Sequence, residues 1–255
     1  MNKHSATSFC HVSPTKGSVS QKHSKAATRS QASRRNVDKF HPELLNGAIL
    51  SPHWEIPTIH ATEVIPNNLI PFSTAMRKDC TDFDAFVCFY EDDSQFERFW
   101  NNPEKYLPQL RKFAGVISPD FSIYPDAPFY VNLTQIARNY ALGSWLQRQG
   151  ITVIANIRVA GERTLSAALD AAPHNSVIAV GAHGNLKRKD NRDQFFTELS
   201  IIISVLHPTM VLLYGTNCYG VFDLFEATNT PLKFYEPEIT KIHHASTLQE
   251  ADSEA

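Results

Sequence analysis

The sequence predicts an α/β fold in which repeated βα units form a mainly parallel sheet, a (β/α) barrel-like or partial-barrel domain with a disordered tail at each end. Five short apolar runs are each followed by polar residues and then by a helix-like stretch, roughly 30 residues apart, as βαβ units require. No GxGxxG follows the first run and no Walker motif is present. Polar residues instead follow every run, which favours a barrel-like sheet over an open doubly wound one.

The apolar runs are short and continuous, as expected of parallel strands covered on both faces. They are Phe86–Tyr90, Gly115–Ile117, Thr152–Ala155, Val177–Val180 and Met210–Tyr214. Leu69–Phe72 and Leu232–Tyr235 are candidates for two further strands. Pro71 restricts the earlier one to an edge or a strand end.

Helical patterns fill the intervals between the strands. Ser94 and Glu97 form a predicted capping box, and Pro103 occupies the first position of a second short helix. Residues 128–149 carry apolar side chains at three- and four-residue spacing, which predicts a long helix. Helices are also expected over 164–172 and from Asp190 to the end of the next apolar stretch.

The charge distribution predicts three segments: a disordered basic tail over residues 1–40, one α/β domain over 41–240 and a disordered acidic tail over 241–255. Eight lysines and arginines oppose a single acid, Asp38, in the first segment. Such a segment buries too little apolar surface to fold alone. Three interpretations stay open: an arm that contacts nucleic acid, a mitochondrial-type presequence, and a solvated tail without a role.

Composition points to a cytoplasmic protein without a membrane partner. No apolar stretch reaches the roughly 18–20 residues of a membrane helix, and the first 40 residues lack the apolar core of a secretory signal. The four cysteines show no CxxC spacing, as suits a reducing compartment.

The polar residues after the strands are the candidate site, because the carboxyl ends of parallel strands meet at one edge of a sheet. Asp92 and Asp93 follow one run and Asp120 follows the next. Carboxylates there can bind a divalent cation or serve as general acid and base. The structural alternatives are helix capping near Asp92 and an Asx-turn at Asp120.

The polar residues after the later runs include an asparagine, an arginine, a histidine and glycines. Asn156 and Arg158 alternate with Ile157 and so point the same way, toward an anionic ligand or toward Asp120 as a structural ion pair. Glycines flank His183 and allow close approach of a ligand. The candidate catalytic residues are Asp92, Asp120 and His183; the candidate ligand-binding residues are Asp93, Asn156, Arg158, Gly181, Gly184 and Asn217; Asp92 and Asp120 are the candidate ligands of a divalent metal ion.

Three segments resemble an uncharacterised family of bacterial, phage and mobile-element proteins, domain of unknown function 4417. They are Gln95–Tyr106, Gly115–Ser122 and Val180–Gly184, within a similar block from about residue 70 to 215. The chain departs from the family in Val159–Arg163, where an aromatic residue is expected soon after the arginine. The resemblance implies a cytoplasmic or phage-encoded protein and supplies no reaction.

Two functions therefore stand as hypotheses, and the sequence does not decide whether the protein is an enzyme. The first is a hydrolase or transferase acting on a phosphorylated or other anionic ligand at the strand ends. The second is a non-catalytic mobile-element accessory protein that binds nucleic acid or a host protein. HExxH, GxSxG and P-loop motifs are absent from the sequence, which disfavours the enzyme classes that use them.

Overall fold

The structure is a computed structural model, and it describes residues 40–182, 189–215 and 221–237. The chain divides into two units, Met1–His41 and Pro42–Ala255, and the description below concerns the second. The predicted basic and acidic tails lie outside the described residues.

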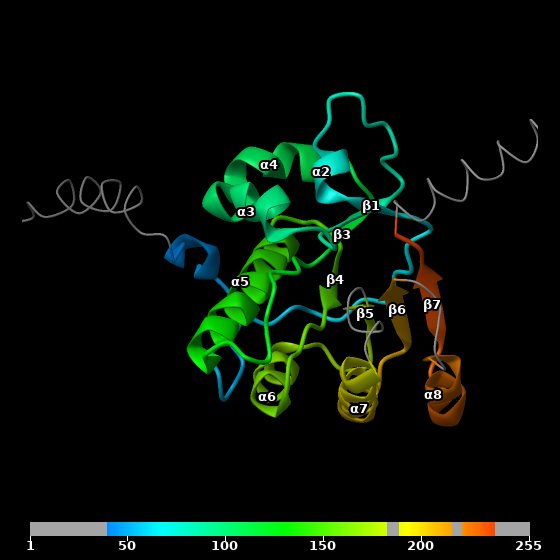
Figure 1. The fold of residues 1–255 in the computed structure, drawn as a ribbon. Helices are drawn as coiled ribbons and strands as arrows, with labels where there is room; N and C mark the ends of the chain where they lie inside the picture. The colour runs from blue at the N-terminus through cyan, green and yellow to red at the C-terminus, as the bar shows by residue number, and fades with distance from the viewer. Residues whose placement is uncertain (1–39, 183–188, 216–220, 238–255) are drawn as a thin grey trace, which may run out of the picture. The chain divides into compact units, whose positions relative to one another are not determined.

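Seven parallel strands form one sheet, in which each strand pairs with the next one along the chain. They are β1 (Leu69–Pro71), β2 (Phe86–Cys88), β3 (Gly115–Ile117), β4 (Val153–Asn156), β5 (Val177–Gly181), β6 (Met210–Tyr214) and β7 (Leu232–Tyr235). The order β1-β2-β3-β4-β5-β6-β7 is that of a (β/α) barrel, but β7 does not pair with β1 within the described residues. The sheet is therefore a curled half-barrel, and the predicted partial-barrel α/β class is confirmed (Figure 1).

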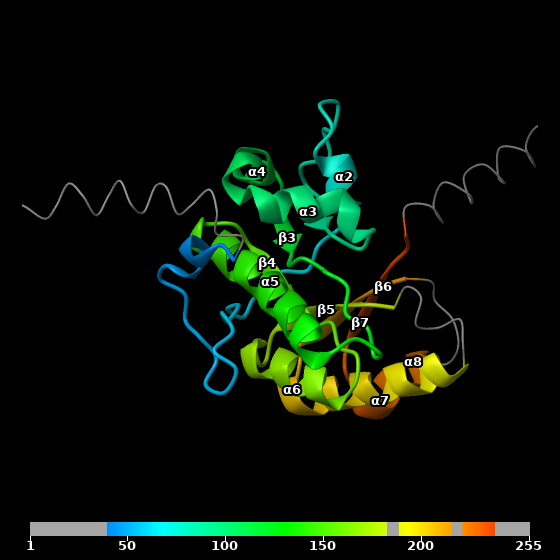
Figure 2. The same ribbon diagram turned by 60° about the vertical axis from the view of Figure 1, so that its left-hand side comes forward.

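Helices connect successive strands and follow one another around the sheet (Figures 1 and 2). The connecting helices are α2 (Phe72–Ala75), α3 (Asp93–Asn101), α4 (Pro103–Leu110), α5 (Phe129–Arg148), α6 (Glu162–Ala171), α7 (Lys189–Leu206) and α8 (Val221–Thr228), and a short 3-10 helix, η1 (Pro42–Leu45), precedes β1. Neighbours along the chain pack against each other, as α5 does on α6 and α7 on both α6 and α8. Among the described residues, no helix is both long enough and apolar enough to cross a membrane.

The start of α3 differs from the predicted capping box. The helix begins at Asp93, one residue earlier than expected, so that Ser94 lies inside its first turn. Asp92 occupies the N-cap position but makes no side-chain capping bond. The capping interpretation of Asp92 is therefore not supported, and Asp93 has a different partner, described below.

The two faces of the sheet carry different cores because side chains alternate along each strand. Val87, Val116 and Ile178 belong to the larger cluster, which the helices complete. Phe86 and Ile154 point to the opposite face, where they join a smaller cluster. The Phe86 ring lies so close to Gly115 that a Cβ atom there would be 2.2 Å from the ring, which explains a glycine at the start of β3.

The segment before β1 is attached to the domain by Asp170 of α6. Its Oδ2 atom accepts hydrogen bonds from the backbone N–H groups of His53 and Trp54, both at 3.0 Å, and its Oδ1 atom lies 2.8 Å from Nδ1 of His53. Burial acts to raise the pKa of Asp170, but hydrogen bonds from Ser51, His53 and Trp54 outweigh it and lower this pKa to about 2.

We expect Asp170→Asn to lower the free energy of unfolding by about 1–2 kcal/mol at neutral pH, because the charged acceptor of several hydrogen bonds is lost. Since the folded-state pKa lies below the ordinary value of 3.8, the wild-type advantage is complete well above that value and declines as the pH falls toward 2. Urea unfolding of both proteins between pH 7 and pH 3 measures it. A difference that stays constant over this range would contradict the assignment.

Candidate functional site

The carboxyl ends of the central strands bring five polar or small residues together. Tyr90 follows β2, Asp120 follows β3, Asn156 ends β4 with Arg158 two residues later, and Gly181 ends β5. Asp120 is only 6% exposed and Asn156 only 2%. A carboxylate buried this deeply needs charged or hydrogen-bonding partners, and the neighbouring strands supply them.

Both carboxylate oxygens of Asp120 have partners. Nδ2 of Asn156 donates to Oδ1 at 2.7 Å, and the guanidinium of Arg158 donates to Oδ2 at 2.6 Å. The hydroxyl of Tyr90 in turn donates to Oδ1 of Asn156 at 2.9 Å. The expected alignment of Asn156 and Arg158 is thus present, and the Asp120–Arg158 pair foreseen from the sequence forms.

Burial raises the pKa of the Asp120 carboxyl above its ordinary value, although Arg158 and the Asn156 amide oppose the shift. The same pair acts the other way on the arginine, because the nearby carboxylate raises the pKa of Arg158. Burial also raises the pKa of Tyr90 well above its ordinary value, so that its hydroxyl stays a donor at neutral pH. The site therefore holds a fixed positive charge beside an acid that is easier to protonate than a free aspartate.

The loop after β3 is held by side chains from two helices. Asn139 of α5 accepts from the backbone N–H of Phe121 at 2.8 Å, and Asn132 accepts from that of Tyr124 at 3.0 Å. Both asparagines also donate to the carbonyl oxygen of the same residue. Asp93 of α3 accepts from the backbone and the hydroxyl of Ser122, the latter at 3.0 Å. These bonds satisfy loop groups that burial would otherwise leave unpaired, and they fix the position of Asp120.

Arg138 of α5 covers the same loop from outside. Its guanidinium lies 3.7 Å from the ring centre of Phe121 and 4.7 Å from that of Trp100, within cation–π range. It also forms an ion pair with Glu97 at 2.6 Å. Arg138 therefore packs the loop against α3 and α5, and its charge is paired with Glu97.

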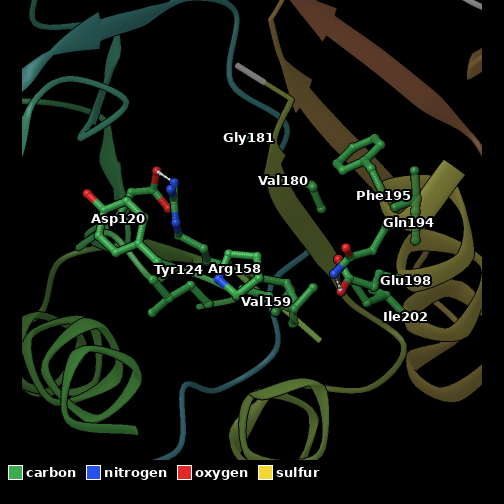
Figure 3. A pocket seen from close by; sticks show the side chains of 15 residues that line it. Asp120, Tyr124, Arg158, Val159, Val180, Gly181, Gln194, Phe195, Glu198 and Ile202 are labelled. Atoms are coloured by element: carbon green, nitrogen blue, oxygen red, sulfur yellow. Dashed lines mark hydrogen bonds and ion pairs between the residues drawn. The ribbon is translucent and has the colours of Figure 1, made fainter. Parts of the chain in front are cut away.

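Two cavities meet at the Asp120–Arg158 pair, since Asp120, Arg158 and Gly181 line both. The α7 cavity, of about 380 Å³, extends from the pair toward α7 and is lined on that side by Gln194 and Glu198 (Figure 3). The β2 cavity, of about 510 Å³, extends toward the ends of β1 and β2 and is lined there by acidic and aromatic residues: Tyr90, Glu91, Asp92 and Tyr214. Both volumes fall in the range of small-molecule sites, roughly 300–1,000 Å³.

Gly181 is a glycine because of the tyrosine beside it. A Cβ atom at this position would lie 3.0 Å from the Tyr90 ring, a distance at which the ring must move. Tyr90 stacks on Tyr214 with ring centres 4.5 Å apart, so it has little room to do so. The glycine at the end of β5 thus permits the stacked tyrosines, and through them the hydrogen bond to Asn156.

The other predicted site residues have different positions. Asp92 is exposed and lines the β2 cavity, whereas Asp93 holds Ser122 and lines neither cavity. His183, Gly184 and Asn217 lie outside the described residues. Within residues 40–182, 189–215 and 221–237, no three His, Cys, Asp or Glu side chains gather as a metal site would require. A metal held by Asp92 and Asp120 stays a prediction.

The sequence pattern does not predict Tyr90, Gln194 and Glu198 as cavity-lining residues. Tyr90 was assigned to a strand, although a tyrosine at the end of an apolar run places its hydroxyl where the other polar groups lie. Gln194 and Glu198 come from a helix, and nothing in their spacing distinguishes them from surface residues of that helix. Only the packing of α7 against the sheet reveals them.

A profile of the family described as "Domain of unknown function (DUF4417)" matches residues 49–228. The chain belongs to this family. The match covers most of the sequence and includes every strand except β7, so the resemblance seen in the three sequence segments is confirmed. DUF4417 membership adds no reaction, and the family's residues here must be interpreted from their geometry.

Two curated phage proteins are similar to this DUF4417 chain, and both are called "Gene 1 protein". The protein of Mycobacterium phage D29 is 26% identical over 166 residues, which is 65% of this chain and 62% of the phage protein. The protein of Mycobacterium phage L5 is 27% identical over the same length, or 72% of that protein. The chain thus spans less than two thirds of the D29 relative. No solved structure matches.

A pair of Tyr→Phe variants tests the hydrogen-bond network. Tyr90 donates to Asn156 within the site, and Tyr140 donates to the carbonyl of Ala168 at 2.8 Å outside both cavities. We expect each variant to lose about 1 kcal/mol of stability, because each leaves a buried acceptor without its donor. Tyr90→Phe alone should raise the pKa of Asp120 further, because the Asn156 amide is held less firmly.

Urea unfolding measures the stability of the two variants, and NMR titration of the aspartate carboxyl carbons measures the pKa. Tyr140→Phe is the matched control. An Asp120 titration that is the same in both variants would show that Tyr90 does not act on Asp120.

Proposed function

We propose that the carboxyl edge of the half-barrel is the active site of an enzyme, a hydrolase or transferase acting on a phosphorylated or other anionic small molecule. One observation carries the proposal: a buried carboxylate is paired with an arginine whose side chain is 31% exposed, at the point where two cavities meet. A pair that served stability alone would have no need of access from both sides.

Arg158 is suited to hold an anionic group. A guanidinium has five N–H donors in a planar fork, and one of them is directed at Asp120. The other donors have no partner among the described residues, and the side chain lines both cavities. Phosphate or carboxylate oxygens can therefore bind Arg158 without breaking the ion pair.

Asp120 is suited to move a proton. Its pKa is raised by burial, which brings it nearer to neutral pH, where a general acid or base works best. Asn156 and Arg158 hold the carboxylate in one orientation, so the group does not have to be positioned during the reaction. Arg158 would bind and orient the anionic group while Asp120 takes a proton from the attacking nucleophile or gives one to the leaving group.

The similar phage proteins and the cysteines bear on where the proposed enzyme acts. The matches to two mycobacteriophage proteins support a phage-associated role, and the described cysteines, Cys80 and Cys88, are not joined by a disulfide, as in a reducing cytoplasm. Neither observation names a substrate.

Substitutions at the ion pair separate binding from chemistry. We expect Arg158→Gln to weaken the binding of inorganic phosphate at least ~10-fold, because a charge-assisted hydrogen bond is lost. Asp120→Asn should keep phosphate binding or strengthen it, since Arg158 is then no longer neutralised, and should abolish turnover. Isothermal titration measures phosphate binding, and release of p-nitrophenol from its phosphate monoester and diester measures turnover.

Arg158→Lys and Asp170→Asn are the controls. The lysine keeps the charge and should retain part of the phosphate affinity, and Asp170 lies outside both cavities, so its loss should leave binding and turnover unchanged. Phosphate affinity that is equal in wild-type protein and a folded Arg158→Gln variant would rule out Arg158 as the anion-binding group.

The basic tail favours the second function, an accessory protein that binds nucleic acid. Eight cationic residues against one acid would release counterions from DNA or RNA, so the affinity should fall at least ~10-fold between 50 and 200 mM salt. Fluorescence anisotropy with a labelled duplex measures this. If the enzyme proposal holds, deleting residues 1–39 leaves phosphate binding and turnover intact; if the deletion removes the only measurable function, the accessory role is the correct one.

A further inference from the structure

The end of the α7 cavity opposite the Asp120–Arg158 pair carries a positioned carboxylate. Oε1 of Glu198 accepts from the backbone N–H of Gly161 at 2.7 Å and from Nε2 of Gln194 at 2.9 Å. These two bonds fix the side chain, and the other carboxylate oxygen, Oε2, has no partner among the described residues. Figure 3 shows Gln194 and Glu198 on one side of the cavity and Arg158 with Asp120 on the other.

Several apolar side chains line the cavity between these two polar ends. Ile123, Val159, Val180, Leu199 and Ile202 line it, and Phe195 adds an aromatic ring on the side of Glu198. The cavity thus combines an apolar middle with a hydrogen-bond donor at one end and an acceptor at the other. Such a lining selects a ligand with a ring-like apolar body, an anionic group at one end and an N–H donor at the other.

We infer that the α7 cavity binds a nucleoside monophosphate, with its phosphate at Arg158 and an N–H edge of its base at Glu198. This inference rests on the proposed function and names its ligand. Exocyclic amino groups and ring N–H groups of bases are donors that a glutamate accepts well. The aromatic ring of Phe195 and the aliphatic side chains offer the flat base an apolar surface.

The orientation follows from the charges in the two cavities. The β2 cavity adds Glu91 and Asp92 to the shared pair, and among the described residues Arg158 is the single arginine or lysine on its lining. Phosphate would be repelled there, so the body of the ligand extends into the α7 cavity. An α-amino acid does not fit this arrangement, because its ammonium and carboxylate are attached to one carbon, whereas Arg158 and Glu198 lie on opposite sides of the cavity (Figure 3).

Glu198 has a structural role as well, because it satisfies the N–H of Gly161 ahead of α6. Glu198→Gln separates the two roles. The glutamine keeps an acceptor for Gly161 and replaces the second oxygen with an amide donor that opposes the base N–H. The exposed Glu226 of α8 provides the matched control, Glu226→Gln, which removes the same charge at a residue that lines neither cavity.

The experiment measures dissociation constants of the full-length protein and its variants for AMP, CMP, GMP and UMP, for the matching nucleosides and for inorganic phosphate, by isothermal titration. At least one monophosphate should bind the wild type more tightly than phosphate does. Glu198→Gln should weaken the binding of that monophosphate and of its nucleoside about 10- to 100-fold and leave the affinity for phosphate unchanged. Arg158→Gln should weaken the binding of the monophosphate and of phosphate and leave the affinity for the nucleoside unchanged. Glu226→Gln should change none of these affinities.

Two results would overturn the inference. If Arg158→Gln weakens the binding of phosphate but Glu198→Gln changes the affinity for no nucleotide, Arg158 binds the anion and Glu198 does not bind the base. If none of the four monophosphates binds more tightly than phosphate, the ligand belongs to another class. Phosphate binding that survives Arg158→Gln defeats the proposed function itself, and so the two failures are distinguishable.

Discussion

The carboxyl edge of this sheet depends on the burial of one carboxylate. Asp120 follows a fully buried strand and is itself only 6% exposed, so its charge must be balanced by groups that other strands bring to it. Asn156 and Arg158 do so from the neighbouring strand, and Tyr90 orients Asn156 from the strand on the other side. Three consecutive strands are thereby coupled through four side chains, and a shift of any one of them leaves a buried polar atom without a partner.

The loop that carries Asp120 is subject to the same requirement. Its backbone is enclosed between α3 and α5, and the asparagines of α5 and Asp93 of α3 take the place of the water that the loop has lost. Hydrogen bonds from both helices restrict the conformations that this loop can adopt. A preorganised site needs such support, and Asp93, a candidate ligand-binding residue in the sequence, supplies it through its hydrogen bonds to Ser122.

The site is asymmetric in a way that limits what it can bind. Arg158 presents its remaining donors to two cavities, but one of them is lined by two additional carboxylates, whereas the other is lined by several aliphatic side chains with Glu198 at its far end. Under the proposed function, electrostatics favours an anion at Arg158, and the aliphatic side chains favour a ligand whose body extends into the α7 cavity. The nearby stack of Tyr90 and Tyr214 leaves little space for a side chain at Gly181, which lines both cavities.

The sequence by itself determined the α/β class, the strands and the edge at which polar groups gather. These follow from local patterns, since apolar runs of strand length and the polar residues after them are read directly from neighbouring positions. It also indicated the Asp120–Arg158 pair, because alternation along a strand places Asn156 and Arg158 on one side. Only the tertiary structure decided that Asp93 supports a loop, that Tyr90 joins the network and that Glu198 faces the pair across a cavity. Those roles depend on how helices pack against the sheet, and contacts between residues distant in the chain leave no periodic signal in the sequence.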